Sequence, residues 1–434
     1  MKPAIRRGEA DDARAAADLY LRAREAALRA GSIPAGVHDH EDVRGYFASH
    51  IVADCELWVA EDAGALAGIL VLDGEWVDQL YVDPDLTGRG IGSDLLAVAK
   101  RERPQGLQLW TFASNAGAQR FYERHGFVEV RRTDGRDNEE RAPDILYEYR
   151  AVERCSFDAP VPGGTLAGWV GGDGPPVLLL HGGPGLSYAY LEGLADEIGP
   201  GYRVAAYQQR GLPPSTTEGP LEVAREVGDV ALVLDALGWE RAWVVGHSWG
   251  GHLLLHVAVA HPERLHGGLA VDPLGGVGDG GAEAFEAGML ARTPEAARAR
   301  AKELDERALA GDGTDDDVRE GLRLMWPAYF ATPEHVLAFP DLRASVEVYA
   351  GLFASLTAAL PDLEAALPRV GVPMGFVAGA GSPMPHDAAA GATARAIPGA
   401  WVEVIEGAGH FPWFERPGKV RAALQRLVGA QVPS

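Results

Sequence analysis

The sequence predicts an α/β protein: a mixed sheet with helices, followed by a larger doubly wound sheet. Two strand–turn–helix patterns carry this prediction. In the first, a strand-like run at 75–82 is followed by a glycine-rich turn and an amphipathic segment that begins at Ser93. In the second, the apolar run 242–245 leads into Gly-His-Ser-Trp-Gly at 246–250 and then into a long apolar segment. Strands that alternate with helices are typical of sheets covered by helices.

Length and composition favour two domains. The chain has 434 residues, of which 47% are hydrophobic, and this is enough for packed cores. We expect one domain at 1–150 and a second at 151–434. The connecting segment 151–155 is too short for the two to swing freely.

The charge and cysteine content of the chain restrict the kinds of ligand and partner that it can bind. The net charge of −23 disfavours nucleic acid and anionic lipid, and two cysteines provide no disulfide framework. The N-terminus lacks the apolar core of a signal peptide, and no apolar stretch reads as long enough to span a membrane. We therefore expect a cytoplasmic protein that takes a small-molecule or short-peptide substrate. The sequence gives no prediction of oligomeric state.

A glycine-rich turn at 83–92 opens the first of these helices. Gly88, Gly90 and Gly92 leave backbone N–H groups accessible, and such groups at a helix N-terminus bind phosphate oxygens. A dinucleotide fingerprint starting at Gly90 would need a third glycine where Leu95 stands, and a P-loop would need Lys-Ser or Lys-Thr. The turn therefore predicts a phosphate site of another kind.

This turn resembles the acetyl-coenzyme A site of the GNAT acyltransferases. Residues 115–127 match that family's N-x-x-A-x-x-F-Y-x-x-x-G-F pattern, and the likeness runs from Ile5 to Tyr149. The resemblance implies acetyl-coenzyme A as co-substrate and Tyr122 as the acid that protonates the departing thiolate. Thr87 departs from the Gln or Arg that the family prefers. The cofactor contacts implied are Leu80, Val82, Gly88, Arg89, Gly90, Ile91, Gly92 and Asn115.

The base that takes the proton from the acceptor amine is left open. Glu75 and Asp78 lie on or beside the central strand, and a carboxylate can act as such a base. Strands also carry many solvated carboxylates without a catalytic role. The acceptor has no signature in the sequence.

The G-x-S-x-G at 246–250 predicts a serine nucleophile. Small residues on both sides of Ser248 allow a turn sharp enough to present its hydroxyl above the sheet. Upstream, an apolar strand ends in His-Gly-Gly-Pro-Gly at 181–185. We expect the N–H groups of Gly183 and Trp249 to form the oxyanion hole.

The general base is expected at His410. This histidine lies on a glycine-flanked loop after the strand-like run 402–405, in the place where the base of such folds follows the last strand. His252 and His256, spaced by four residues, are a weaker pattern, because a zinc protease would have glutamate where Leu253 stands. We expect no metal.

From Val177 to the C-terminus the chain resembles the α/β-hydrolase superfamily, specifically its proline iminopeptidase-like branch. That branch carries H-G-G-P-G, D-Q-R-G and G-x-S-W-G-G in this order, and Gln208 replaces the aspartate of the second motif. The resemblance implies a doubly wound sheet with a helical cap, which we place at about 274–368. The branch holds the substrate amine with cap glutamates near a tryptophan, but Trp326 has no adjacent glutamate.

Three assignments are possible for the acid of the catalytic triad. Ser382 occupies the position where the family usually has an aspartate, and a hydroxyl cannot replace a carboxylate beside an imidazolium. Asp272 ends the strand that follows the serine helix and preserves the order Ser, acid, His. We favour Asp272, with Asp387 or no carboxylate as alternatives; a strand-ending aspartate before proline is also common turn chemistry.

Together these features predict a bifunctional enzyme. One half would be a serine hydrolase of the aminopeptidase or amide-hydrolase type, and the other an acetyl-coenzyme A-dependent N-acetyltransferase. The alternative is an esterase, lactonase or acyl-amide hydrolase whose transferase domain only binds a ligand or serves as a scaffold.

Overall fold

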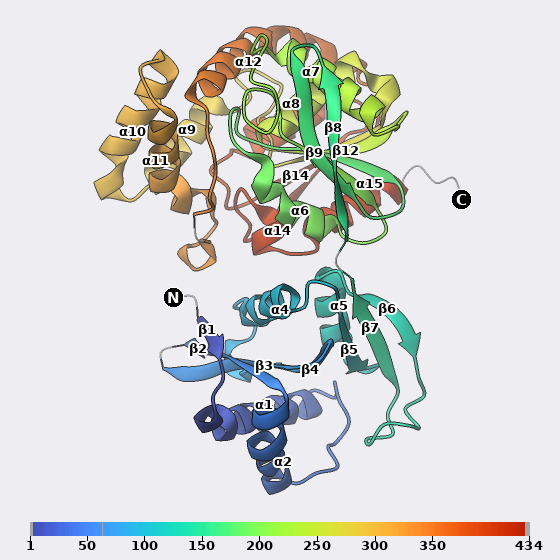
Figure 1. Ribbon diagram of the computed structural model, residues 1–434. Helices are drawn as coiled ribbons and strands as arrows, with labels where there is room; N and C mark the ends of the chain where they lie inside the picture. The colour runs from blue at the N-terminus through green and yellow to red at the C-terminus, as the bar shows by residue number, and fades with distance from the viewer. Residues whose placement is uncertain (1–2, 63, 151, 338, 430–434) are drawn as a thin grey trace. The chain divides into compact units, whose positions relative to one another are not determined.

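The chain forms two compact units, Met1–Ala151 and Val152–Ser434. A computed structural model describes residues 3–62, 64–150, 152–337 and 339–429 (Figure 1). Each unit is α/β and has its own sheet, which confirms the predicted fold class.

The described part of the N-terminal unit contains a seven-stranded sheet in the order β1-β2-β3-β4-β5-β7-β6. Its strands are β1 Ala4–Arg7, β2 Glu56–Asp62, β3 Ala65–Asp73, β4 Trp76–Val82, β5 Leu107–Phe112, β6 Val128–Arg132 and β7 Asp144–Tyr149. Its helices are α1 Ala13–Arg29, α2 His40–Tyr46, α3 Val52–Asp54, α4 Ile91–Glu102 and α5 Ala116–Arg124.

Strand β3 separates two hydrophobic layers of this unit. Because successive side chains of a strand point to opposite faces, its residues divide between two cores. Ile69 and Val71 pack with α1, whereas Leu70 and Leu72 pack with α4 (Figure 1). The sheet is therefore covered on both faces.

Strands β4 and β5 pair only at their beginning. Their parallel register contains a single residue pair, Trp76 with Gln108, and the strands separate beyond it. The edge of β4 that faces β5 therefore lacks strand partners from Val77 to Val82. An opening between two strands can receive an extended, amide-bearing ligand.

The described part of the C-terminal unit contains an eight-stranded sheet in the order β15-β14-β13-β12-β10-β11-β9-β8. All neighbours are parallel except the antiparallel pairs β8–β9 and β9–β11. The strands are β8 Arg154–Val161, β9 Gly164–Gly171, β10 Pro176–Leu180, β11 Arg203–Tyr207, β12 Ala242–His247, β13 Leu265–Val271, β14 Met374–Gly379 and β15 Trp401–Ile405. The helices beside the sheet are α6 Leu191–Ile198, α7 Val223–Ala236, α8 Trp249–Ala260, α13 Ala392–Ala396, α14 Pro412–Glu415 and α15 Lys419–Gly429.

Helices cover both faces of this sheet as well. Leu178 and Val244 pack with α7 and α8, while Val177 and Val245 pack with α6 and α15. Parallel strands covered on both faces are hydrophobic throughout, and β12 is buried along its whole length. The carboxyl ends of β10, β12, β13 and β14 therefore meet at one edge, where α/β sheets bind ligands.

Four helices inserted between β13 and β14 form the cap. They are α9 Ala282–Arg292, α10 Glu295–Ala310, α11 Asp315–Met325 and α12 Val346–Ala366. Against our expectation of no membrane-length apolar stretch, one helical segment of the described chain, Val346–Arg369, is long and apolar enough to span a membrane. Packing offers another reason for this composition, because Leu352, Leu356 and Leu363 of α12 belong to the core shared with α8.

A buried polar cluster lies between β11 and α7. The Arg210 guanidinium donates to both carboxylate oxygens of Asp229, at 2.8 and 2.9 Å, and both side chains are fully buried. The neighbouring Glu226 carboxyl and Tyr207 hydroxyl have no hydrogen-bond partner among the described residues. Burial, with the charge of Asp229, raises the pKa of Glu226 to about 8.

This cluster predicts a pH-dependent stability. The folded-state pKa of Glu226 lies above its ordinary value of 4.5, so the stability it contributes is complete below that value and is lost as the pH rises to about 8. Relative to Glu226→Gln, we expect the free energy of unfolding of the native chain to fall by about 1 kcal/mol per pH unit in this window. Urea unfolding of both proteins across the window measures the difference, and a constant difference would contradict the assignment.

Candidate active site

Ser248 lies in a strained turn between β12 and α8. Its φ of 54° and ψ of −119° are unusual for a residue with a side chain. The flanking glycines are required by close backbone approach: a Cβ on Gly250 would lie 2.1 Å from the Leu180 oxygen, and one on Gly246 2.2 Å from the Gly250 oxygen. The local sequence therefore folds into the sharp turn that the motif predicts.

Asp272 and His410 meet behind this turn. The Nδ1 atom of His410 lies 2.5 Å from Oδ2 of Asp272, and the two residues are 3% and 0% exposed. The other carboxylate oxygen accepts the N–H of Gly379 at 2.9 Å. The contact between His410 and Asp272 fixes the imidazole so that Nε2 is the nitrogen left for a proton from Ser248. Ser248 and His410 line one cavity.

Ser382 and Asp387, the other residues considered at the position of the triad acid, make different contacts. The Ser382 hydroxyl donates to Oδ2 of Asp272 at 2.5 Å and itself accepts the Met384 N–H at 3.0 Å. Ser382 therefore supports the acid at Asp272. The structure contradicts the alternative assignment of Asp387 as the triad acid, because its side chain is 90% exposed and lies 3.9 Å from His386.

The expected oxyanion hole lies between two loops. Gly183 follows β10 with a φ of 63°, and Trp249 begins α8, where N–H groups have no partner within the helix. The loops are in close contact, since a Cβ on Gly182 would lie 2.8 Å from the Ser248 Cβ. Gln209 accepts the indole N–H of Trp249 at 2.8 Å and so holds that ring.

A hydrogen-bond chain that the sequence did not predict joins the three catalytic loops. The Gly182 N–H donates to the Tyr190 hydroxyl at 2.5 Å, which lies 2.9 Å from Nδ1 of His247. The Nε2 atom of His247 lies 2.9 Å from the His410 carbonyl oxygen. Burial lowers the pKa of His247 and keeps the ring neutral, so Nε2 donates and Nδ1 accepts.

The cap is attached to the oxyanion loop by backbone hydrogen bonds. The Ser345 N–H donates to the Gly185 carbonyl at 2.8 Å, and the Ser187 N–H donates to the Arg343 carbonyl at 2.9 Å. These bonds flank a short antiparallel bridge between the two segments.

The cap is also attached to the loop of the catalytic histidine. The His410 N–H donates to the Tyr329 carbonyl at 2.7 Å. The buried Glu415 carboxylate accepts the N–H of Gly409 at 2.6 Å and that of Ala331 at 2.8 Å. The oxyanion loop and the loop of His410 are therefore both in contact with the cap.

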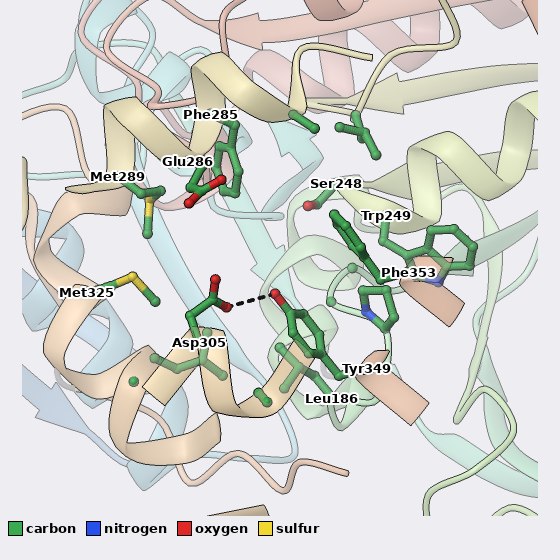
Figure 2. Close-up of a pocket in the computed structure, with 18 of the residues that line it drawn as sticks. Leu186, Ser248, Trp249, Phe285, Glu286, Met289, Asp305, Met325, Tyr349 and Phe353 are labelled. Atoms are coloured by element: carbon green, nitrogen blue, oxygen red, sulfur yellow. Dashed lines mark hydrogen bonds between the residues drawn. The ribbon is translucent and has the colours of Figure 1, made fainter. Parts of the chain in front are cut away.

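A cavity of about 750 Å³ lies between the catalytic loops and the cap (Figure 2). Several acidic residues line it, and Figure 2 shows two whose side chains extend into it and which the sequence analysis missed: Glu286 from α9 and Asp305 from α10. The Tyr349 hydroxyl donates to Asp305 at 3.0 Å. Burial, together with the charge of Glu286, raises the pKa of Asp305. Trp326 lines the same cavity, and both carboxylates are distant from it in sequence.

The predicted phosphate turn of the N-terminal unit has the backbone shape that such a site needs. Gly88 and Gly90 have φ values of 80° and 85°, which favour glycine. Gly90 precedes α4 and provides no side-chain cap, so the first N–H groups of that helix are left to a ligand. Thr87 donates to the Pro84 carbonyl within the turn. These features fit the diphosphate of acetyl-coenzyme A.

The other predicted residues of this unit lie around the split between β4 and β5. Leu80 and Val82 lie on β4 beyond its pairing with β5. Asn115 caps α5 by accepting the Ala118 N–H at 3.0 Å, and burial raises the pKa of Tyr122 on that helix.

Asp78 and Glu75, the two carboxylates considered as the general base of the N-terminal unit, lie in different environments. Burial, with the nearby charge of Asp73, raises the pKa of Asp78 on β4. Glu75 lies in the turn before β4, and its carbonyl accepts the Gln108 N–H at 2.9 Å. A raised pKa brings a carboxylate closer to the basicity that proton abstraction needs.

His252 and His256 are packed against each other, with Nε2 atoms 3.2 Å apart, and Nδ1 of His252 contacts the Gly275 carbonyl. The part of the chain that the structure describes contains no group of three or more His, Cys, Asp or Glu side chains that could hold a metal ion.

A doubly wound sheet with Ser, His and Asp at its strand ends, beneath a helical cap, defines the class of α/β hydrolases. Residues 175–417 match the family model for the alpha/beta hydrolase fold, which is more than half of the chain, and the protein belongs to this family. Residues 53–129 match the acetyltransferase (GNAT) domain. The protein is thus a fusion of a GNAT domain with an α/β hydrolase.

Curated relatives are similar to the hydrolase unit. Epoxide hydrolase B of Mycobacterium tuberculosis is 39% identical over 109 residues, which are 24% of this chain and 31% of the relative. Epoxide hydrolase A of the same organism is 27% identical over 286 residues, 58% of this chain and 89% of the relative. Among solved structures, the esterase EaEST from Exiguobacterium antarcticum aligns with 63% of this chain and 98% of its own, at 21% identity and a TM-score of 0.48. The chain spans about a third of the length of the first relative.

The contact between Ser382 and Asp272 predicts a specific kinetic change. Replacing Ser382 with alanine removes one donor from the Asp272 carboxylate, which orients the His410 imidazole. We expect kcat/KM to fall about tenfold. An unchanged kcat/KM in folded Ser382→Ala would show that the hydroxyl does not support the acid.

Proposed function

We propose that the hydrolase unit cleaves acyl compounds that carry a free amine close to the scissile carbonyl. The observation that carries this proposal is the pair of carboxylates, Glu286 and Asp305, in the same cavity as Ser248 (Figure 2). Asp305 is half-buried and the exposed Glu286 carboxylate faces it across the cavity. Two neighbouring carboxylates, one of them partly removed from water, attract a cation. A substrate ammonium group provides that cation, as in the proline iminopeptidase-like branch that the motifs resemble.

The chemistry follows from the positions of the catalytic groups. Ser248 attacks the carbonyl carbon while His410 takes its proton, and Asp272 stabilises the imidazolium that forms. The N–H groups of Gly183 and Trp249 hold the developing oxyanion. His410 returns the proton to the leaving amine or alcohol, and water then releases the acyl group by the same route.

Acyl transfer suits this nucleophile better than the activity named for the epoxide hydrolase relatives. Attack of a serine oxygen on an epoxide carbon leaves an ether, which has no carbonyl carbon for water to attack. Attack on an acyl carbon leaves an ester, which the same histidine can hydrolyse. Ester and amide substrates use the same machinery, so the esterase alternative differs only in the leaving group.

The carboxylate pair gives a direct test. We expect native protein to hydrolyse alanyl-p-nitroanilide at least about 100-fold faster in kcat/KM than propionyl-p-nitroanilide, which lacks only the amine. Glu286→Gln and Asp305→Asn should each reduce that preference about tenfold, because each removes a charge-assisted contact. Glu303→Gln, on the exposed face of α10, is the matched control.

Release of nitroaniline must also disappear in Ser248→Ala. Equal rates for the two anilides would overturn the role of the amine while leaving a serine hydrolase. Turnover of prolyl-p-nitroanilide would favour the aminopeptidase form. Folded protein that cleaves p-nitrophenyl esters but no anilide would favour the esterase form.

We further propose that the N-terminal unit transfers an acetyl group from acetyl-coenzyme A to an amine. The match to the GNAT domain and the uncapped helix after Gly90 support cofactor binding. Asp78 is then the better of the two candidate bases, and Tyr122 is the acid for the departing thiolate.

Binding of acetyl-coenzyme A is measurable without knowing the acceptor. In isothermal titration we expect a single site, with affinity reduced at least about tenfold in Gly90→Val, because a β-branched residue resists the positive φ of that position. Gly64→Val, a positive-φ glycine in the turn between β2 and β3, is the control for backbone strain elsewhere. No heat of binding with native protein would leave this unit as a scaffold.

A further inference from the structure

The cavity does not end at the carboxylate pair. Figure 2 shows Glu286 and Asp305 between Ser248 on one side and Met289 and Met325 on the other. Beyond the acids the cavity continues between the helices of the cap. Most of its lining there is apolar and comes from α9, α10 and α11: Met289, Leu290, Leu304, Gly321, Leu322 and Met325. The same helices also contribute Lys302, Glu306 and Asp317 to the lining.

The size of this space exceeds what a small aminoacyl group needs. At about 750 Å³ the cavity falls among pockets of about 300–1,000 Å³ that hold drug-sized ligands. Two methionines in its wall add adaptable apolar surface, because an unbranched thioether side chain fills irregular space. An apolar compartment of this kind favours an apolar guest.

The order of groups along the cavity limits what the substrate can be. In an α-amino acyl group, the carbon next to the scissile carbonyl carries the amine, a hydrogen and one further substituent, the side chain. With the carbonyl at Ser248 and the ammonium between Glu286 and Asp305, that substituent extends toward Met289 and Met325.

We infer that the hydrolase selects α-amino acyl groups with a long apolar side chain, which the interior of the cap receives. This inference rests on the proposed function, since it assumes that the acid pair holds the amine. Each methylene group buried in the compartment should raise kcat/KM about threefold to fourfold. Alanyl and prolyl groups are then poor members of the substrate class.

The first experiment compares a series of L-aminoacyl-p-nitroanilides: alanyl, 2-aminobutyryl, norvalyl, norleucyl and 2-aminooctanoyl. We expect kcat/KM of native protein to rise along the series, with norleucyl at least about tenfold above alanyl. A flat or falling series in which alanyl is cleaved would overturn the inference and leave the proposed function intact. No cleavage of any aminoacyl anilide or p-nitrophenyl ester, or equal cleavage by Ser248→Ala, would instead remove the proposed function.

A second experiment fills the compartment. A Cβ on Gly321 would lie 3.6 Å from the Leu304 Cβ, an ordinary contact, so Gly321→Leu places its side chain in this space. We expect the preference for norleucyl over alanyl to fall at least about tenfold. Ala310→Leu adds a leucine side chain at an exposed position of α10 and should leave that preference unchanged.

We expect Gly321→Leu to fold, because α11 gains helix propensity when it loses glycine. Its folding is checked before the rates are compared. Gly321→Ala is the graded version and should reduce the preference by less. An unchanged preference in folded Gly321→Leu would show that the side chain does not enter the cap and would overturn the inference.

Discussion

The hydrogen bond between His410 and Asp272 is the constraint on which the hydrolase site depends. It joins side chains from the ends of two different strands, and neither residue is more than 3% exposed. To reach it, Asp272 adopts a φ of 45°, a conformation that costs energy for a residue with a side chain. Surrounding bonds from Gly379 and Ser382 hold the carboxylate against that cost.

The acidic groups at the two ends of the site differ in their hydrogen bonds. Asp272 has three hydrogen-bond partners inside the protein. Asp305 has one, from Tyr349, and faces the carboxylate of Glu286 across the cavity. Its raised pKa marks an unmet demand for positive charge, and a ligand can meet that demand. On the proposed function, selectivity in this cavity is electrostatic near the serine and hydrophobic farther away.

The sequence predicted what depends on short-range patterns. The elbow around Ser248, the glycine turn before α4 and the α/β class follow from residues that are neighbours in the chain. Glu286 and Asp305 were missed because they lie on charged helices where many carboxylates are solvated, and only the packing of α9 against α10 and α11 distinguishes them. The partnership of Ser382 with Asp272 was equally hidden, since 110 residues separate them. Sequence comparison with a family motif made Ser382 look like a loss of function, whereas it supports the acid.

The attachments of the cap have a consequence for how substrate can enter. Its first anchor is the bridge between the oxyanion loop and the segment before α12, and its second is Glu415, which connects Ala331 to the loop of His410. A cap held at these two places cannot lift as one lid without distorting the machinery it covers. Any opening that keeps both attachments intact must move α9, α10 and α11, the helices that line the apolar end of the cavity.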